Sequence, residues 1–184
     1  APVDLQAIKA CGVTFAQSML ERVIEERAAG DPGAAERIRE EIRNTIGLNL
    51  SDIIPGSAEA AQLKSVLVGK GMWSQYLEVG IGPDAEVFTK AQPMSAVGIG
   101  AEVGLLSKSE WNNPEPEITL IVNSNATIVG ATLGNDVNLR DIEGRSALLL
   151  GKAKDNNASA AIGPFIRLFD QKFTLSDVRL AELS

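Results

Sequence analysis

The chain has 184 residues, of which 45% are hydrophobic and 22% charged, so it is long and apolar enough to fold around its own core. Its 24 acidic and 17 basic residues give a net charge of −7, which argues against binding to nucleic acid, and no stretch approaches the roughly 18 apolar residues of a membrane span. The sequence contains no histidine, which excludes the usual zinc ligand sets and the Ser-His-Asp and Cys-His nucleophile systems. Cys11 has no second cysteine to pair with, which favours a reducing compartment, and we expect a cytoplasmic protein.

The first third of the chain has the apolar spacing of helices. Residues 15–24 predict a first helix, with charged residues on its other face. Asp31 and Pro32 predict the N-cap and first residue of a second helix, which carries isoleucines four residues apart at 38, 42 and 46. Ser57 predicts the N-cap of a third helix, which ends near Gly69 or Gly71.

After Trp73 the pattern changes to short β-type runs separated by Gly, Asn and Pro. The expected strands are residues 86–90, 101–106, 118–122 and 127–133. Residues 123–126 (Asn-Ser-Asn-Ala) predict a hairpin turn between the last two, and residues 148–150 and 162–169 predict further buried segments. We therefore expect an α+β chain, with a helical N-terminal region at 1–72 followed by a strand-rich domain at 73–184.

The first candidate site is the pair Glu115 and Glu117. Residues two apart in a strand point to the same face, so both carboxylates would project together. Like charges held side by side repel unless a proton or cation lies between them, and hard divalent cations accept such oxygen ligands. An exposed strand face with two solvated glutamates explains the same pattern, so the pair alone is a weak signal.

Two later segments could complete that site. Asp136 lies 19 residues after Glu117, at the end of the following strand, and the hairpin could return it beside the glutamates. Three carboxylates would leave positions open for water and substrate, as Mg²⁺ prefers. Lys152 and Lys154 follow, and a lysine near a divalent cation would have a lowered pKa and could serve as an acid or base. The alternatives are an Asn-Asp turn and a pair of solvated surface lysines.

Several short motifs follow one another in a fixed order and at fixed separations, and this combination indicates a protein family more specifically than any single motif does. The motifs are Glu115-Pro116-Glu117, Asn135-Asp136-Val137, Arg140-Asp141, the lysine segment and Ile162-Gly163-Pro164-Phe165. In this order the chain resembles the fumarylacetoacetate hydrolase family, and it looks closest to its branch of 2-keto-3-deoxy-pentonate dehydratases. The resemblance implies a β-rich roll around a metal, usually in a homodimer, with a small keto acid as substrate. It also implies that the roll is incomplete at the C-terminal end of this chain.

The resemblance assigns roles to individual residues. It implies that Glu115, Glu117 and Asp136 are the protein ligands of Mg²⁺, or of Mn²⁺ in its place. Arg140 falls where the family has a substrate-binding arginine. The positions of Glu143 and Lys152 also imply substrate contacts, while Lys154 is preferred as the acid–base lysine.

The lack of histidine distinguishes between the two reactions that the resemblance allows, hydrolysis and dehydration. Hydrolases of this family use a histidine paired with a glutamate to activate water, and such a dyad cannot form from these residues. Dehydration needs no external nucleophile, only loss of a C3 proton and of the C4 hydroxyl. The expected activity is therefore an Mg²⁺-dependent dehydratase that yields α-ketoglutarate semialdehyde. A hydrolase that cleaves a carbon–carbon bond in a 2,4-diketo acid or acylpyruvate, with a carboxylate as base, is the alternative.

Overall fold

The computed structural model describes residues 3–12, 20, 23–24, 27–28, 31–47 and 53–181. It divides into two compact units: Cys11–Val87 forms one, and Ala1–Ala10 together with Phe88–Ser184 forms the other. The mixed helix and strand content agrees with the α+β expectation. The domain limits expected from the sequence, 1–72 and 73–184, stay a prediction. No helix in the described part of the chain is long and apolar enough to cross a membrane.

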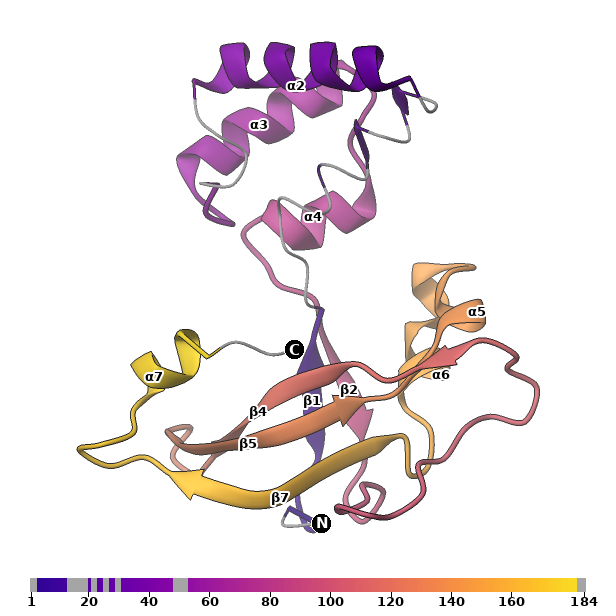
Figure 1. Ribbon diagram of the computed structural model, residues 1–184, viewed down its shortest axis with the longest axis vertical. Coiled ribbons are helices and arrows are strands. Elements are labelled where there is room, and N and C mark those ends of the chain that lie inside the picture. The colour runs from indigo at the N-terminus through magenta and orange to yellow at the C-terminus, as the bar shows by residue number, and fades with distance from the viewer. Residues whose placement is uncertain are drawn as a thin grey trace. The chain divides into compact units, whose positions relative to one another are not determined.

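The unit Cys11–Val87 is built from helices. Its three main helices are α2 (Pro32–Ile46), α3 (Ala58–Gly69) and α4 (Gln75–Ile81) (Figure 1). The predicted caps are confirmed: the Asp31 carboxylate accepts a hydrogen bond from the backbone two residues later (2.9 Å), and the Ser57 hydroxyl accepts one three residues later (3.1 Å). α3 ends at Gly69, one of the two predicted glycines.

The core of this unit is apolar. Of the helix predicted at 15–24, Leu20, Val23 and Ile24 are described and helical, while Phe15 lies outside the described residues. Leu20 and Ile24 are buried, and Ile42 from the predicted α2 stripe is fully buried with them. The buried members of the cluster are Leu20, Ile24, Ala28, Ala35, Ile42, Ile53, Ala60, Leu63, Leu67, Met72, Leu77 and Ile81. Helical spacing thus identified the buried face correctly.

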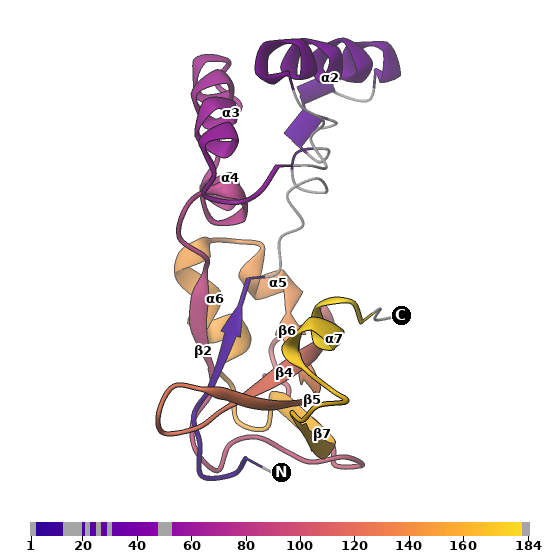
Figure 2. The ribbon, with the colours of Figure 1, turned by 90° about the vertical axis from the view of Figure 1, so that its left-hand side faces the viewer.

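The second unit contains most of the strands. They are β1 (Ile8–Cys11), β2 (Val87–Ala91), β3 (Asn112–Asn113), β4 (Pro116–Val122), β5 (Ile128–Asp136), β6 (Asn138–Leu139) and β7 (Ala160–Leu168). The strands β4, β5 and β7 form an antiparallel sheet with β5 in the centre (Figure 1). The strands β1 and β2 pair with each other (Figure 2), and β3 pairs with β6.

The β4–β5 hairpin confirms the turn predicted at residues 123–126. The Asn123 side chain accepts hydrogen bonds from the backbone N–H groups of Asn125 (2.9 Å) and Thr127 (3.1 Å), which closes the turn. Ala126 takes the left-handed conformation that such a turn needs, with φ of 59°. The hairpin then runs in register from Ile121 opposite Gly130 to Pro116 opposite Asn135.

Short helices follow the sheet strands. They are α5 (Arg140–Glu143), the 3-10 turn η2 (Ala147–Leu149), α6 (Leu150–Lys154) and α7 (Leu175–Arg179). A small apolar cluster of Leu139, Ile142 and Ala153 joins β6, α5 and α6, and Leu106 and Leu149 pack against it. This cluster fixes the end of α6 near the end of β5, where the candidate site lies.

Several local predictions were wrong. Strand β1 was not predicted within the helical front, because its four residues pair with β2, which lies far along the chain. Residues 101–106 form no strand: Gly104 makes a single backbone hydrogen bond to Ala158 (2.9 Å) instead of joining a ladder. Leu148 is 95% exposed, and in β7 only the first residues are buried, whereas Phe165 is exposed.

Candidate metal centre

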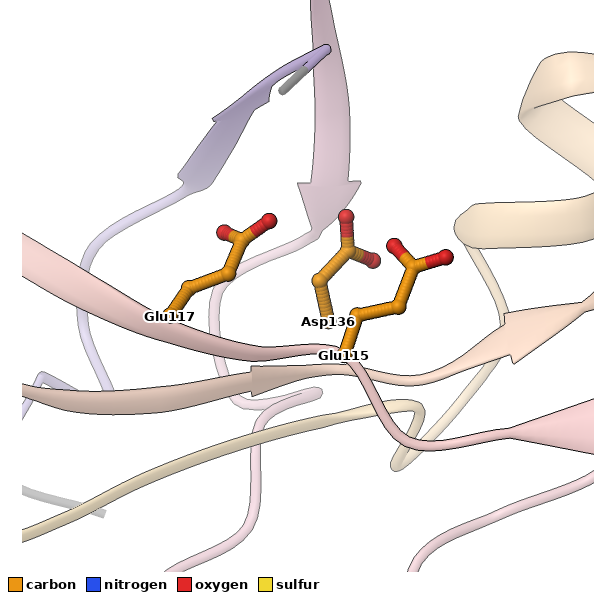
Figure 3. A group of neighbouring side chains, drawn as sticks. All are labelled: Glu115, Glu117 and Asp136. Atoms are coloured by element: carbon orange, nitrogen blue, oxygen red, sulfur yellow. The ribbon is translucent and has the colours of Figure 1, made fainter. Parts of the chain in front are cut away.

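Three carboxylates lie together on one face of the β4–β5 hairpin. One carboxylate oxygen from each of Glu115, Glu117 and Asp136 lies within 4.8 Å of the other two. Figure 3 shows the three side chains projecting to the same side of the two strands. Asp136 is buried, and both glutamates are half-buried. The structure therefore brings together all three residues that the sequence predicted as ligands.

The hairpin register explains this convergence. Glu117 lies opposite Gly134, and two residues further along, the backbone N–H of Asp136 donates to the carbonyl of Glu115 (2.9 Å). Directly opposed and alternate residues of an antiparallel pair share one face. The side chain of Asn135 accepts a hydrogen bond from the backbone N–H of Glu115 (3.0 Å), which fixes the chain just before β4. The Glu-Pro-Glu and Asn-Asp motifs are thus two halves of one hairpin end.

Gly134 leaves room on this face. A Cβ atom at this position would lie 2.3 Å from the Thr119 hydroxyl oxygen, closer than any unstrained contact. Because the residue opposite Glu117 is glycine, the Thr119 hydroxyl fits beside it, and a side chain at position 134 would displace that hydroxyl.

The electrostatics of the cluster suit a cation. Burial raises the pKa of Glu117 to about 7, and the charges of Asp136 and Glu115 add to that rise against the opposing effect of the nearby lysines. Asp136 Oδ1 is buried and accepts no hydrogen bond, although Lys90 Nζ lies 3.0 Å away. Three crowded carboxylates, one of them with a buried oxygen that accepts no hydrogen bond, are the donor set that Mg²⁺ or Mn²⁺ takes. The residues present therefore fit the metal that the resemblance implies.

Lys154 lies among these carboxylates. Its side chain is 4% exposed, and Nζ donates to Glu115 Oε2 and to Asp136 Oδ2, the latter at 3.0 Å. The ammonium also lies 5.7 Å from the centre of the Phe88 ring. Burial lowers the pKa of Lys154, but the hydrogen bond to Glu115 and the charge of Asp136 outweigh it, so that the pKa is raised. The neighbouring carboxylates thus raise the pKa of Lys154, whereas a nearby divalent cation would lower it.

A second lysine, Lys90 on β2, is buried on the other side of Asp136. Its side chain is 2% exposed, and Nζ lies 3.0 Å from Asp136 Oδ1. Nζ donates hydrogen bonds to the carbonyls of Val137 (2.8 Å) and Lys154 and to the Ser159 hydroxyl (3.3 Å). Burial lowers the pKa of Lys90, against the charge of Asp136, which raises it. Two buried ammonium groups therefore face the one buried carboxylate.

Asn138 connects the carboxylates to α5. Its side-chain amide is fully buried and donates to Glu115 Oε1 (2.9 Å) and Glu143 Oε2 (2.6 Å). Glu143 Oε2 also accepts from Arg140 Nη1 (2.7 Å). These two hydrogen bonds lower the pKa of Glu143 against the effect of its burial, which is the largest single influence and raises it. Glu143 and Arg140 are thus placed one amide away from the carboxylate cluster.

Lys152 lies elsewhere. It is exposed, and its positive charge helps to lower the pKa of Lys108. Of the two lysines that the resemblance allowed, the structure brings Lys154 to the carboxylates. The assignment of Lys152 to substrate binding stays a prediction.

Sequence analysis missed Lys90 and Asn138. Lys90 ends the strand predicted at residues 86–90, and a lysine at a strand end is usually a surface residue. Asn138 directly follows the Asn135-Asp136-Val137 motif, in a segment where an asparagine is typical of a turn. The available signal was spacing: Asp136 and Asn138 are two apart, as Glu115 and Glu117 are.

Comparison with known proteins identifies dehydratases as relatives. The chain is 40% identical over 86 residues to the 2-dehydro-3-deoxy-D-arabinonate dehydratase of Saccharolobus solfataricus, a match that covers 47% of this chain and 29% of the relative. It is 40% identical over 95 residues to a probable 2-keto-3-deoxyxylonate dehydratase of Haloferax volcanii, covering 52% of this chain and 32% of the relative. No family model matches the chain.

A solved structure agrees with these matches. It is 2-keto-3-deoxy-D-arabinonate dehydratase complexed with magnesium and 2,5-dioxopentanoate, with a TM-score of 0.50 and 37% identity over 52% of this chain and 34% of that one. The chain spans about a third of the length of the relatives it matches. The predicted similarity to 2-keto-3-deoxy-pentonate dehydratases is confirmed.

Proposed function

We propose that this chain carries the metal and acid–base site of an Mg²⁺-dependent dehydratase, a carbon–oxygen lyase. Its substrate is a 2-keto-3-deoxy pentonate, and its product is α-ketoglutarate semialdehyde. One observation carries the proposal: Glu115, Glu117 and Asp136 meet within 4.8 Å, in a chain 40% identical to dehydratases over about half its length. A relative of that kind has been solved with magnesium and 2,5-dioxopentanoate, a five-carbon product of the proposed type.

The three carboxylates would hold the metal. Asp136 offers the buried oxygen that accepts no hydrogen bond, and the glutamates offer oxygens from the neighbouring strand. A bound Mg²⁺, or Mn²⁺ in its place, supplies a Lewis acid that polarises the 2-keto acid group and favours loss of the adjacent C3 proton. The protein fixes these oxygens on a paired hairpin end, which is a rigid platform for a small charged substrate.

Lys154 would be the acid–base group: its ammonium can give a proton to the leaving C4 hydroxyl, and the amine that results can take the proton from C3. The reaction removes a proton from C3 and hydroxide from C4, which leave together as water, and tautomerisation then moves the double bond to give the C5 aldehyde. Lys154 Nζ lies against Glu115 and Asp136, on the carboxylate face where the substrate would bind. Its 4% exposure keeps bulk water away from the transferred proton.

Arg140 and Glu143 would bind the substrate. The Arg140 guanidinium is 39% exposed at its side chain and carries the charge that a substrate carboxylate needs. Glu143 holds it by the 2.7 Å hydrogen bond and offers an oxygen for a substrate hydroxyl. We assign Lys152 a weaker, outer contact, because its side chain is exposed. The proposal extends to a β-rich roll that acts as a cytoplasmic homo-oligomer.

The test uses the longest natural form of this chain, stripped of metal and supplied with 2-keto-3-deoxy-xylonate or 2-keto-3-deoxy-arabinonate. We expect α-ketoglutarate semialdehyde, detected by mass spectrometry, to form with Mg²⁺ and not with a chelator present. Failure to form it while Mg²⁺ binds would contradict the dehydratase proposal. Incorporation of ¹⁸O from water into a cleaved acid from a 2,4-diketo acid would then favour the hydrolase alternative.

A further inference from the structure

Lys90 is the most completely buried cation in the described residues, and the proposed reaction gives it no role. It lies on β2, while its partners lie at the β5–β6 junction, at the end of α6 and just before β7. All of these belong to the unit that contains Phe88–Ser184. A charge buried at 1% residue exposure is costly unless it is both paired and hydrogen-bonded. Lys90 therefore performs a task that an apolar residue could not.

The hydrogen bonds of Lys90 are directed away from its charged partner. An ammonium has three N–H donors, and the acceptors of Lys90 are the carbonyls of Val137 and Lys154 and the hydroxyl of Ser159. All three acceptors are uncharged oxygens. Asp136 Oδ1 lies 3.0 Å from the same nitrogen and yet accepts no hydrogen bond. Lys90 therefore attracts Asp136 by charge without covering its oxygen with a proton.

Lys154, in contrast, forms a hydrogen bond with the other carboxylate oxygen of Asp136, Oδ2, to which its Nζ donates at 3.0 Å. The two oxygens of this carboxylate thus face two lysines at equal distance, one hydrogen-bonded and one not. In addition, the backbone carbonyl of Lys154 accepts a hydrogen bond from Lys90 Nζ. Lys90 therefore contacts both the carboxylate of Asp136 and the backbone of Lys154, the proposed acid–base residue.

We propose that Lys90 is a positioning residue, which holds Asp136 and the Lys154 end of α6 together and keeps Asp136 Oδ1 free to bind a divalent cation. This inference rests on the proposed function for the existence of the metal site. The three uncharged acceptors are essential to it, because they occupy the N–H groups that would otherwise cover Asp136 Oδ1. Lys90 does not touch the reacting atoms; it acts through the ligand and through α6.

The test measures Mn²⁺ binding by electron paramagnetic resonance, without substrate, on the longest natural form of the chain. Removing a group that holds a metal ligand in place typically lowers metal affinity by about 10- to 100-fold. We expect Lys90→Met to lower the Mn²⁺ affinity by about that factor. Lys172→Met removes an exposed lysine of the same unit and should leave the Mn²⁺ affinity unchanged. Binding is measured well below the unfolding temperature of each variant, so that loss of fold and loss of affinity are separated.

Unchanged or tighter Mn²⁺ binding in folded Lys90→Met would overturn the proposal, since it would mean that Lys90 only supports the fold or only repels the cation. If the parent chain binds no Mn²⁺, the proposed function fails together with this inference. If the parent binds and Lys90→Met binds equally well, only the inference fails. The two failures are therefore distinguishable.

A second variant keeps the lysine itself. Ser159→Ala removes one of the three uncharged acceptors and almost no volume, so that one N–H of Lys90 becomes free to turn to Asp136 Oδ1. We expect weaker Mn²⁺ binding, by about tenfold, although every ligand and both lysines remain. An affinity equal to that of the parent would show that the direction of the Lys90 hydrogen bonds does not matter, and would overturn the proposal even if Lys90→Met fails to fold.

Discussion

The two units of this chain bury different kinds of side chain. Among the described residues, the buried cluster of Cys11–Val87 is entirely apolar, from Leu20 to Ile81. The other unit contains every buried polar or charged side chain that the structure describes. These are Lys90, Thr132, Asp136, Asn138, Lys154 and Ser159. Apolar burial stabilises a fold, whereas buried charges rarely do, so this difference separates a region built for stability from one built for chemistry.

The charged region is not a random collection of ion pairs. Burial and the neighbouring carboxylates raise the pKa of Glu117, and one buried oxygen of Asp136 accepts no hydrogen bond. A region selected only for stability would replace such a cluster with apolar residues of similar volume, often at no cost. The comparison therefore supports the proposed site at the β4–β5 hairpin end and assigns a stabilising role to the helices.

The largest effect is expected when a carboxylate of the hairpin is neutralised. Glu115→Gln keeps the shape of the side chain but removes a charged oxygen, and we expect turnover to fall below detection and Mn²⁺ affinity to fall by more than about 100-fold. Lys154 keeps its partner Asp136, so the variant should still show a cooperative thermal transition. Glu102→Gln, an exposed glutamate of the same unit, is the control. Full activity in Glu115→Gln would contradict the metal assignment.

The helical unit should respond in the opposite manner. Leu63 is fully buried in α3, so Leu63→Ala should lower the free energy of unfolding by about 2–5 kcal/mol, measured in urea, while Mn²⁺ affinity of the folded protein stays unchanged. Val68→Ala in the same helix removes a side chain that is 54% exposed and should cost much less. If Leu63→Ala changed the Mn²⁺ affinity as much as Glu115→Gln does, the proposed division of the chain into a stabilising unit and a metal-binding unit would be wrong.

The sequence predicted these two regions by different routes. The helices followed from local rules: Asp31 and Ser57 cap them, and apolar spacing selects the buried face. Strand alternation and the hairpin at residues 123–126 suggested the three candidate carboxylates, and the resemblance to a known family assigned them as ligands. The strand β1 and Lys90 could not be predicted, because each depends on partners distant in the chain; Lys9 on β1, for example, donates to Thr89 on β2 (2.6 Å). Long-range pairing leaves no periodic signal in the segment itself.

A smaller effect, on stability, is expected when a side chain is added beside the Thr119 hydroxyl. Gly134→Ala places a Cβ against the Thr119 hydroxyl, and overpacking of this kind costs about 1–3 kcal/mol. Thr119→Ala should restore most of that loss in the double variant, which a double-mutant cycle measures as a coupling energy. Gly151→Ala meets no atom within 4 Å and should be neutral or stabilising, since it lies in α6. Additive effects of the Gly134 and Thr119 substitutions would show that the face is not tightly constrained there.

The smallest expected effect is a pH dependence of the metal-free chain. Because the pKa of Glu117 is raised to about 7 in the folded state, the folded protein holds this proton more tightly than the unfolded chain does. The free energy of unfolding of the parent, relative to Glu117→Gln, should therefore rise as the pH falls from about 8 to about 5.5. The chain has no histidine, the side chain that ordinarily titrates in this range, so the signal has little background. Excess Mg²⁺ favours the ionised carboxylate and should remove the difference, whereas parallel curves for parent and variant without metal would mean that burial and the neighbouring carboxylates do not raise the pKa of Glu117.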